Sequence, residues 1–187
     1  IPNMDKLAKE SLCGLSVPVA HGITPGSGPS HLALFGYNPF EFDIGRGVLE
    51  AIGLGITMTK NDLAARANFA TLDYSKNIVT DRRAGRPATE KTVEMCKFLQ
   101  DNIKRIDDVD VTIKPGKGHR FVVMFTGETL GQDLTDNDPQ KDGYKPKVIK
   151  ELSPDSKKTA DIINKFLNKV TELIKDKNPI NYTLVRG

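Results

Sequence analysis

The chain of 187 residues carries 27 basic and 24 acidic residues, so its formal net charge is only +3 and does not demand a nucleic-acid partner. At 38% hydrophobic and 27% charged, its composition is that of a globular protein of one sizeable or two small domains. It has two cysteines and neither a membrane-length apolar run nor a secretion signal, which favours a cytoplasmic protein and argues against a disulfide framework.

Both ends of the chain are expected to lie in packed structure. A helix is predicted from about residue 3, because Asn3 can cap it and Met4 and Leu7 then share one face. Residues 181–187 resemble a strand that is cut off at its far side. These features indicate an internal piece of a longer protein.

A loop of small residues occupies positions 22–30 and contains Ser27 and Ser30. Its glycines permit close approach to a ligand, its prolines stiffen the turn, and the apolar run after His31 predicts a short buried helix or strand. Such a loop can bring an oxygen nucleophile to a phosphate, although an ordinary surface connection has the same composition. We interpret His31 as a packed, hydrogen-bonded ring rather than a catalytic base.

Short elements are predicted next. Residues 47–54 form a helix, and residues 63–72 alternate so that Arg66 and Asn68 share one face of a strand. A second short strand at 77–80 runs directly into an arginine-rich segment.

Two long amphipathic helices are predicted, at about 87–106 and 153–177, with a β-hairpin at 109–126 between them. The first helix is expected to bury the residues Val93, Cys96, Leu99, Ile103 and Ile106. Helices and strands mix, which predicts an α/β fold of α+β layers with a mixed sheet and flanking helices.

The segment from 130 to 146 has no periodicity and contains four aspartates. The spacing of Asp136 and Asp138 invites a calcium site, but the segment lacks the glycine position and final glutamate of an EF-hand. A solvated turn is the favoured interpretation.

Seven of the eight arginines lie outside the two long helices. A fixed guanidinium fork suits bidentate recognition of phosphate or carboxylate, so this placement indicates an anionic small ligand. The alternative is a set of surface ion pairs near turns.

Three segments carry a resemblance to a known family: PNMDKLA at 2–8, GSGPSHLALFGY at 26–37 and DRRAGR at 81–86. Together they resemble the cofactor-independent phosphoglycerate mutases of the archaeal type, members of the alkaline phosphatase superfamily. Further agreements cover nearly the whole chain, with GRG at 45–47, RANFAT at 66–71, GHR at 118–120, TDNDP at 135–139 and LVRG at 184–187.

The resemblance implies an isomerase of glycolysis and gluconeogenesis that interconverts 3-phosphoglycerate and 2-phosphoglycerate through a phosphoserine. Ser27 is the implied nucleophile and metal ligand, with Ser30 as the local rival. Two divalent metals (Mn, Mg or Zn) are implied in the full-length protein, and no 2,3-bisphosphoglycerate. The implied substrate-binding residues are Arg66, Asn68, Asp81, Arg82, Arg83, Arg86, His119 and Arg120, for each of which a structural ion pair is the alternative.

The resemblance also implies a division of the chain. Residues 1–50 and 181–187 are expected to belong to a phosphatase-like core, and residues 51–180 to an inserted substrate-binding domain. The family's Asp-Gly strand and Asp/His cluster, which complete the metal sites, are not in this sequence. We therefore expect the fragment to be inactive alone and to bind no metal tightly; metal identity and oligomeric state are left open.

Two other functions are weighed. A metal-dependent phosphatase of the same superfamily would use the same serine. A nucleic-acid-binding module is disfavoured, because there is no tryptophan and Tyr37, Phe40 and Phe42 cluster only beside the first loop.

Overall fold

A computed structural model describes residues 1–23, 26–42 and 44–187. It divides into two compact units, Ile1–Ile44 and Gly45–Gly187, each described by itself below. Both the 45–50 and the 181–187 segments lie in the second unit. The expected assignment of residues 1–50 and 181–187 to a phosphatase-like core stays a prediction. None of the helices in these described ranges is long and apolar enough to cross a bilayer.

The first unit contains two helices, α1 (Pro2–Glu10) and α2 (Ser27–Leu34). Helix α1 begins at a proline and no side chain caps it, so the expected cap by Asn3 is wrong; Pro2 suits the first turn because it needs no N–H donor there. The apolar segment after His31 is helical but not buried, since Leu34 is 78% and Phe35 72% exposed. Helix α2 contains no buried residue that could shield them, so the expected burial is also wrong.

The second unit is built on a six-stranded sheet with β1 (Asp62–Asp73) near its centre. Residues 66–68 of β1 pair with β5 on one side and with β6 on the other. The hairpin of β4 and β5 matches the sequence prediction. The remaining strands are β2 (Ile78–Asp81), β3 (Arg105–Ile106), β4 (Val109–Pro115), β5 (Arg120–Thr126) and β6 (Tyr182–Arg186).

Every described strand pair is antiparallel, whereas the sequence predicted a mixed sheet. The long connection from β5 through a helix to β6 does produce two strands of the same direction. However, β1 lies between them and pairs antiparallel with both. The layered fold of helices on a sheet is confirmed, and only the strand direction differs.

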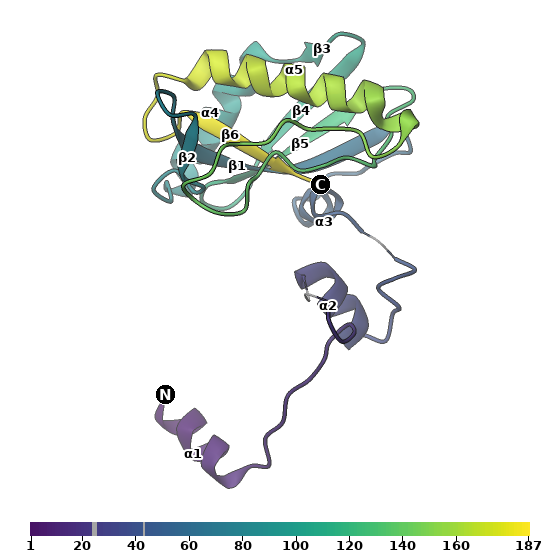
Figure 1. Cartoon of the computed structure of the whole chain (residues 1–187), viewed down its shortest axis with the longest axis vertical. Coiled ribbons are helices and arrows are strands. Elements are labelled where there is room, and N and C mark those ends of the chain that lie inside the picture. The colour runs from purple at the N-terminus through teal and green to yellow at the C-terminus, as the bar shows by residue number, and fades with distance from the viewer. Residues whose placement is uncertain (24–25, 43) are drawn as a thin grey trace. The chain divides into compact units, whose positions relative to one another are not determined.

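Helices cover both faces of this sheet (Figure 1). Helices α4 (Thr89–Asn102) and α5 (Lys157–Ile174) pack on one face and share a single hydrophobic core with it. Helix α3 (Arg46–Gly53) packs on the opposite face, where Ala51 meets Ala64 and Val122. The same face also carries the polar residues Arg66 and Asn68 of β1, the second of which is only 7% exposed.

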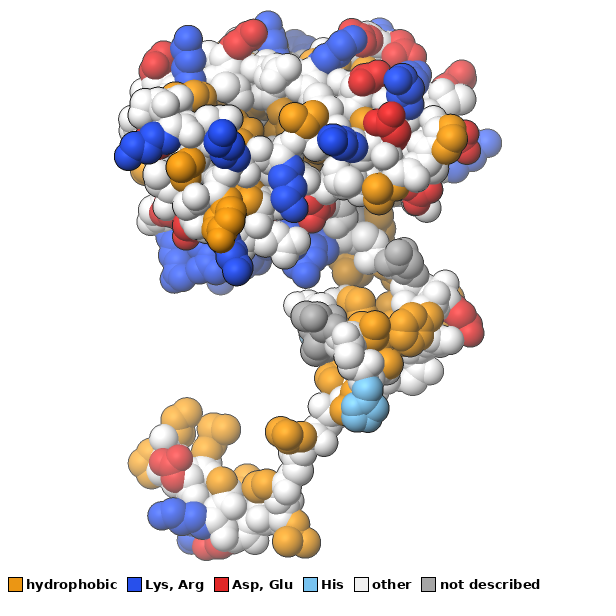
Figure 2. Space-filling view, in the orientation of Figure 1, with side chains coloured by type: hydrophobic (Ala, Val, Ile, Leu, Met, Phe, Trp, Pro, Cys, Tyr) orange, Lys and Arg blue, Asp and Glu red, His pale blue; other side chains and the backbone are white. Residues whose placement is uncertain are grey.

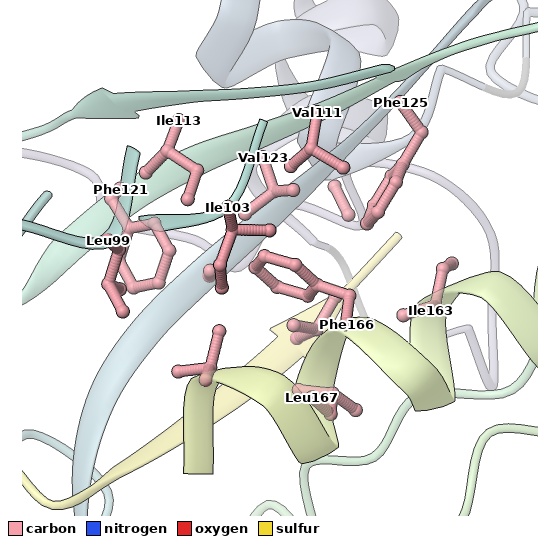
Figure 3. Packing of buried hydrophobic residues seen from close by; sticks show 14 of the residues in the cluster. Leu99, Ile103, Val111, Ile113, Phe121, Val123, Phe125, Ile163, Phe166 and Leu167 are labelled. Atoms are coloured by element: carbon pink, nitrogen blue, oxygen red, sulfur yellow. The ribbon is translucent and has the colours of Figure 1, made fainter. Parts of the chain in front are cut away.

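Aromatic side chains pack among aliphatic ones in the main core (Figure 3). Phe69 of β1 stacks on Phe121 of β5 with ring centroids 4.5 Å apart. Phe125 meets Phe166 of α5 edge-on at 5.5 Å, and all four rings are fully buried. Each such side chain contributes on the order of 1.5–3 kcal/mol through burial, so this layer fixes the sheet that carries the site.

The first long helix ends earlier than expected. Helix α4 stops at Asn102, and Arg105–Ile106 forms the short strand β3 instead. The backbone of β4 supplies its partners, and Gln100 donates to the Val111 carbonyl at 3.0 Å. Tertiary pairing therefore overrides helical periodicity at this end of the helix. Separately, Val93 was expected in the buried stripe but is 47% exposed. Likewise α5 follows a short 3-10 turn (Pro154–Ser156) and ends at Ile174, not Lys177.

Candidate functional site

The face of the sheet on which α3 packs also carries polar and charged side chains from β1, β5 and β6. Arg66 and Asn68 share this face of β1, as predicted, because they stand two residues apart on one strand. The strand register places Arg120 of β5 opposite Asn68, and Arg186 of β6 opposite Arg66. Three arginines from three strands thus come together on one surface.

His119 immediately precedes β5, and its carbonyl accepts a hydrogen bond from the Phe69 amide at 2.8 Å. The turn before it is fixed by helix α4, since the Gly118 amide donates to Thr89 Oγ1 at 3.1 Å and the Thr92 hydroxyl donates to the Gly118 carbonyl. These contacts bring the hairpin to the N-terminal end of α4. The sequence analysis did not find either threonine, because their partner lies more than 25 residues away.

Residues 81–86, here called the arginine turn, lead from β2 toward α4. Asp81 shapes the turn, because its carboxylate accepts hydrogen bonds from the Arg83 and Gly85 amides at 2.8 and 2.6 Å. Ala84, Gly85 and Arg86 all have positive φ, at 47°, 71° and 56°. This backbone leaves the side chains of Arg83 and Arg86 exposed.

Ion pairing separates the arginines into two groups. Within the described residues, the arginines that pair with carboxylates are Arg82, Arg105 and Arg186. Five have no carboxylate partner there: Arg46, at the start of α3, and the four that we call the arginine cluster, Arg66, Arg83, Arg86 and Arg120. Of the residues implied by resemblance, Asp81 and Arg82 are thus engaged in holding structure, whereas the cluster arginines have no such carboxylate partner in the described residues.

The cluster generates a positive field around His119. Burial lowers the pKa of this imidazole, and the charges of all four cluster arginines lower it further, to about 4. Burial and the charge of Arg120 are also the main causes that lower the pKa of Arg66. Figure 2 shows lysine and arginine side chains gathered along the lower edge of this unit. At neutral pH the site therefore holds a neutral histidine among unneutralised guanidinium groups.

Two buried polar atoms at this site lack partners within the described part of the chain. These are Nε of Arg66, a donor, and Oδ1 of Asn68, an acceptor on a residue only 7% exposed. Buried polar groups are normally satisfied, so these two atoms mark a place in the site where a further polar partner would be favourable.

The segment 130–146, which was expected to be a solvated turn, is buried at its centre. Asn137 and Asp138 are fully buried, and Arg82 donates to both carboxylate oxygens of Asp138. The expectation is wrong because long-range partners replace water around these groups. The spacing of the polar residues at 136–138 was the available sequence signal for this site. The neighbouring sequence does not show which distant residues pair with them.

Ser27 is the first residue of α2 and is exposed, while Ser30 is half-buried in the first turn. The amides of a helix N-terminus lack intrahelical partners and favour an anion beside them. The His31 ring hydrogen-bonds with the Ser27 carbonyl at 2.6 Å, as expected, but its side chain is exposed, so the expected packing of the ring is wrong. Ser27 and the arginine cluster lie in different units.

The described residues do not fit a metal centre. Among residues 1–23, 26–42 and 44–187, no three His, Cys, Asp or Glu side chains gather where they could hold a metal ion. A two-metal site needs several such ligands for each ion. We therefore derive no chemical step through a metal.

The low pKa of His119 predicts a pH-dependent loss of stability. Between pH 6.5 and about 4 the unfolded chain binds a proton at this histidine while the folded chain does not, so the free energy of unfolding falls as pH falls. Because His119 is only half-buried, we expect an effect of about 1 kcal/mol after solvent screening. Denaturant unfolding at pH 7 and pH 4.5 should show that His119→Gln reduces this loss; an equal loss in both proteins would contradict the assignment.

A family model matches residues 8–181, and its description is 2,3-bisphosphoglycerate-independent phosphoglycerate mutase. Two relatives are named "Probable 2,3-bisphosphoglycerate-independent phosphoglycerate mutase". The one from Thermotoga sp. (strain RQ2) is 54% identical over 186 residues, and the one from Aquifex aeolicus 48% identical over 192 residues. Each covers the whole chain, which spans 46% and 47% of their lengths.

Two solved structures are also similar. A cofactor-independent phosphoglycerate mutase from Thermoplasma acidophilum is 31% identical with a TM-score of 0.70, over 84% of this chain and 45% of that one. A protein from Pyrococcus horikoshii is 31% identical with a TM-score of 0.62, and the match covers 100% of this chain and 43% of the Pyrococcus chain. The chain thus spans about half the length of the proteins it matches.

Proposed function

The chain belongs to the family of 2,3-bisphosphoglycerate-independent phosphoglycerate mutases, and from this premise we propose that it forms part of an enzyme that interconverts 3-phosphoglycerate and 2-phosphoglycerate. The enzyme is an isomerase that transfers a phosphoryl group within its substrate. In this proposal the chain contributes the nucleophile, Ser27, and the residues that hold the substrate. A cytoplasmic location follows from the same proposal.

The observation that carries the proposal is the arginine cluster around a neutral His119. Phosphoglycerate has a carboxylate and a phosphate a few bonds apart, and guanidinium groups bind both through paired, charge-assisted hydrogen bonds. Four cationic side chains without carboxylate partners in the described residues match such a multiply charged ligand. When several arginines hold the glycerate, it stays in the site while Ser27 carries the phosphoryl group. Transfer of that group to water is then disfavoured.

The reaction runs in two matched transfers. The Ser27 hydroxyl loses its proton and its oxygen bonds to phosphorus as the bond from phosphorus to one substrate oxygen breaks; the departing oxygen takes up a proton. The glycerate reorients while its carboxylate stays bound to arginine. Its other hydroxyl then attacks the phosphoserine, loses its proton and regenerates the Ser27 hydroxyl.

The family name describes an enzyme independent of 2,3-bisphosphoglycerate. The resemblance further implies two divalent metals (Mn, Mg or Zn), which would lower the pKa of a bound hydroxyl and screen phosphate charge. Since the described residues do not fit such a centre, we propose that Ser27 is the contribution of this chain and that the other ligands come from elsewhere in the enzyme. The chain alone is then inactive.

The product distinguishes a mutase from a phosphatase. With the full-length protein and 3-phosphoglycerate as substrate, we expect 2-phosphoglycerate to form, measured by coupling to enolase, with little inorganic phosphate. Release of phosphate as the main product would replace the proposal by phosphatase activity. Mutase-level turnover by residues 1–187 alone, with added manganese, would contradict the division of labour proposed here.

Arg66→Gln should weaken substrate binding, because it removes a guanidinium group whose buried Nε has no partner in the described residues. We expect KM for 3-phosphoglycerate in the full-length enzyme to rise about 10-fold to 100-fold, the range for losing one charge-assisted contact. Arg105→Gln is the matched control, since Arg105 is 60% exposed and pairs with Asp110 on β4. An equal rise in KM in the two variants would contradict the role of Arg66.

A further inference from the structure

Asp138 is a fully buried carboxylate that the reaction proposed above does not use. Arg82 donates to its two oxygens at 2.8 and 2.6 Å, and the Gln140 amide donates to it at 2.8 Å. Arg186 Nε lies 3.7 Å away. Burial opposes the charged form, but the hydrogen bonds and the two arginine charges outweigh it and hold the pKa of Asp138 below its usual range. Asp138 is thus an anion held between two arginines.

On one side, the segment containing Asp138 is fastened to β6. Asn137 Oδ1 accepts a hydrogen bond from the Val185 amide at 2.6 Å, and the Asn137 amide donates to the Val185 carbonyl at 3.3 Å. Asp136 accepts from the Gly187 amide at 3.1 Å and pairs with Arg186 at 3.4 Å. These contacts extend the edge of the sheet, so the segment cannot move without disturbing β6.

On the other side, the same segment holds the arginine turn. Besides the bidentate pair with Arg82, the Arg82 amide donates to Asp142 at 2.9 Å. The turn itself contains two non-glycine residues in the left-handed region, Ala84 and Arg86. Such conformations cost on the order of 1 kcal/mol each and persist only where surrounding contacts determine them. The contacts of Arg82 with Asp138 and Asp142 add to the hydrogen bonds that Asp81 accepts within the turn and so favour this conformation.

The carboxylates of Asp136 and Asp138 also reduce the repulsion between two arginines that face each other on neighbouring strands. Arg186 lies directly opposite Arg66 on neighbouring strands, and like charges in this position are destabilising. Pairing with Asp136 and Asp138 neutralises Arg186, while Arg66 keeps its charge for a ligand. The segment thus pairs with Arg82 and Arg186, which become structural, and leaves the arginine cluster to bind a ligand.

We propose that Asp138 is a positioning residue, which ties the arginine turn to the end of β6 and so holds Arg83 and Arg86 beside Arg66 and Arg120. The inference rests on the proposed function, in which the arginine cluster binds phosphoglycerate. Asp138 does not touch the substrate; it acts through Arg82 and the turn that follows it.

The test is Asp138→Asn in the full-length protein, with the pKa of His119 measured by NMR and KM and kcat measured in the mutase assay. If the turn moves away, His119 loses the charges of Arg83 and Arg86, and its pKa rises from about 4 toward 6.5. Loss of the Asp138 charge alone would shift this pKa downward, so a rise reports displacement of the arginines. We expect KM to rise about 10-fold and kcat to change less than about 3-fold.

Combining Asp138→Asn with substitutions in the arginine turn distinguishes a loss of positioning from a general destabilisation of the fold. In the Arg83→Gln/Arg86→Gln protein, Asp138→Asn should cause no further rise in KM, because the residues through which it acts are gone. Asp108→Asn is the control, as its 2.6 Å pair with Lys158 joins the β3–β4 turn to α5 and involves no cluster arginine. It should change neither the His119 pKa nor KM. An unchanged or lower His119 pKa, or KM effects that multiply in the combined variant, would overturn the inference.

Two further outcomes are decisive. If Asp138→Asn does not fold, Arg82→Lys replaces it, since lysine keeps the charge but loses the two-point contact; a rise in the His119 pKa supports positioning and no rise refutes it. If the wild-type protein shows no mutase activity, the proposed function fails. The His119 titration still decides whether Asp138 positions the arginine turn, because it needs no turnover.

Discussion

Ser27→Ala in the full-length enzyme is expected to lower kcat by about 10³-fold or more, because it removes the oxygen that carries the phosphoryl group in the proposed reaction. Substrate should still bind, since the arginine cluster is intact. The measurement combines the coupled enolase assay with mass spectrometry of the protein after brief exposure to 3-phosphoglycerate, which should detect a phosphoserine in the wild type and none in Ser27→Ala.

Ser30→Ala is the matched control, because Ser30 lies one turn along the same helix and is half-buried. Its kcat should stay within about 3-fold of the wild type, a change below about 1 kcal/mol. Loss of the phosphoserine in Ser30→Ala, with retention in Ser27→Ala, would reverse the assignment of the nucleophile.

Gly47→Ala is expected to lower the free energy of unfolding by about 2–4 kcal/mol, the range for forcing atoms into a packed contact. Gly47 lies where α3 meets β1, and a Cβ there would overlap the Ala64 carbonyl oxygen and stand 2.6 Å from Ala65 Cα. Backbone atoms of a central strand cannot give way, so α3 must move off the sheet. Urea unfolding monitored by circular dichroism measures the loss.

Gly53→Ala provides the comparison within the same helix. A Cβ at Gly53 would meet nothing within 4 Å, and alanine is favoured over glycine in a helix by up to ~1 kcal/mol. The variant should therefore be as stable as the wild type or slightly more so. Equal destabilisation by the two substitutions would show that helix propensity, not the close approach of α3 to β1, decides the effect.

Most elements of the fold were predictable because their signals are local. The alternation along β1, the hairpin signature of β4 and β5 and the apolar stripe of α5 all depend on residues a few positions apart. The errors occur where distant partners decide. Helix α4 ends early because β4 offers backbone partners to residues 105–106, and the strand direction depends on where β1 inserts.

The candidate site divides in the same way. Sequence placed Arg66 and Asn68 on one face of a strand, and the structure confirms that placement. It could not separate Arg82, which pairs with Asp138, from Arg83 and Arg86, which stand beside it in one short motif. That separation depends on a carboxylate more than 50 residues away in a segment without periodicity.

By itself, the sequence determined the family, the order of most helices and strands, and the types of residue available for phosphate chemistry, because motifs and periodicity are written in neighbouring positions. Only the tertiary structure decided which arginines pair with carboxylates and which do not. The physical reason is that a guanidinium group is committed by whichever carboxylate the fold brings within hydrogen-bonding distance, and folding brings Asp136 and Asp138 to Arg82 and Arg186 but not to the arginine cluster.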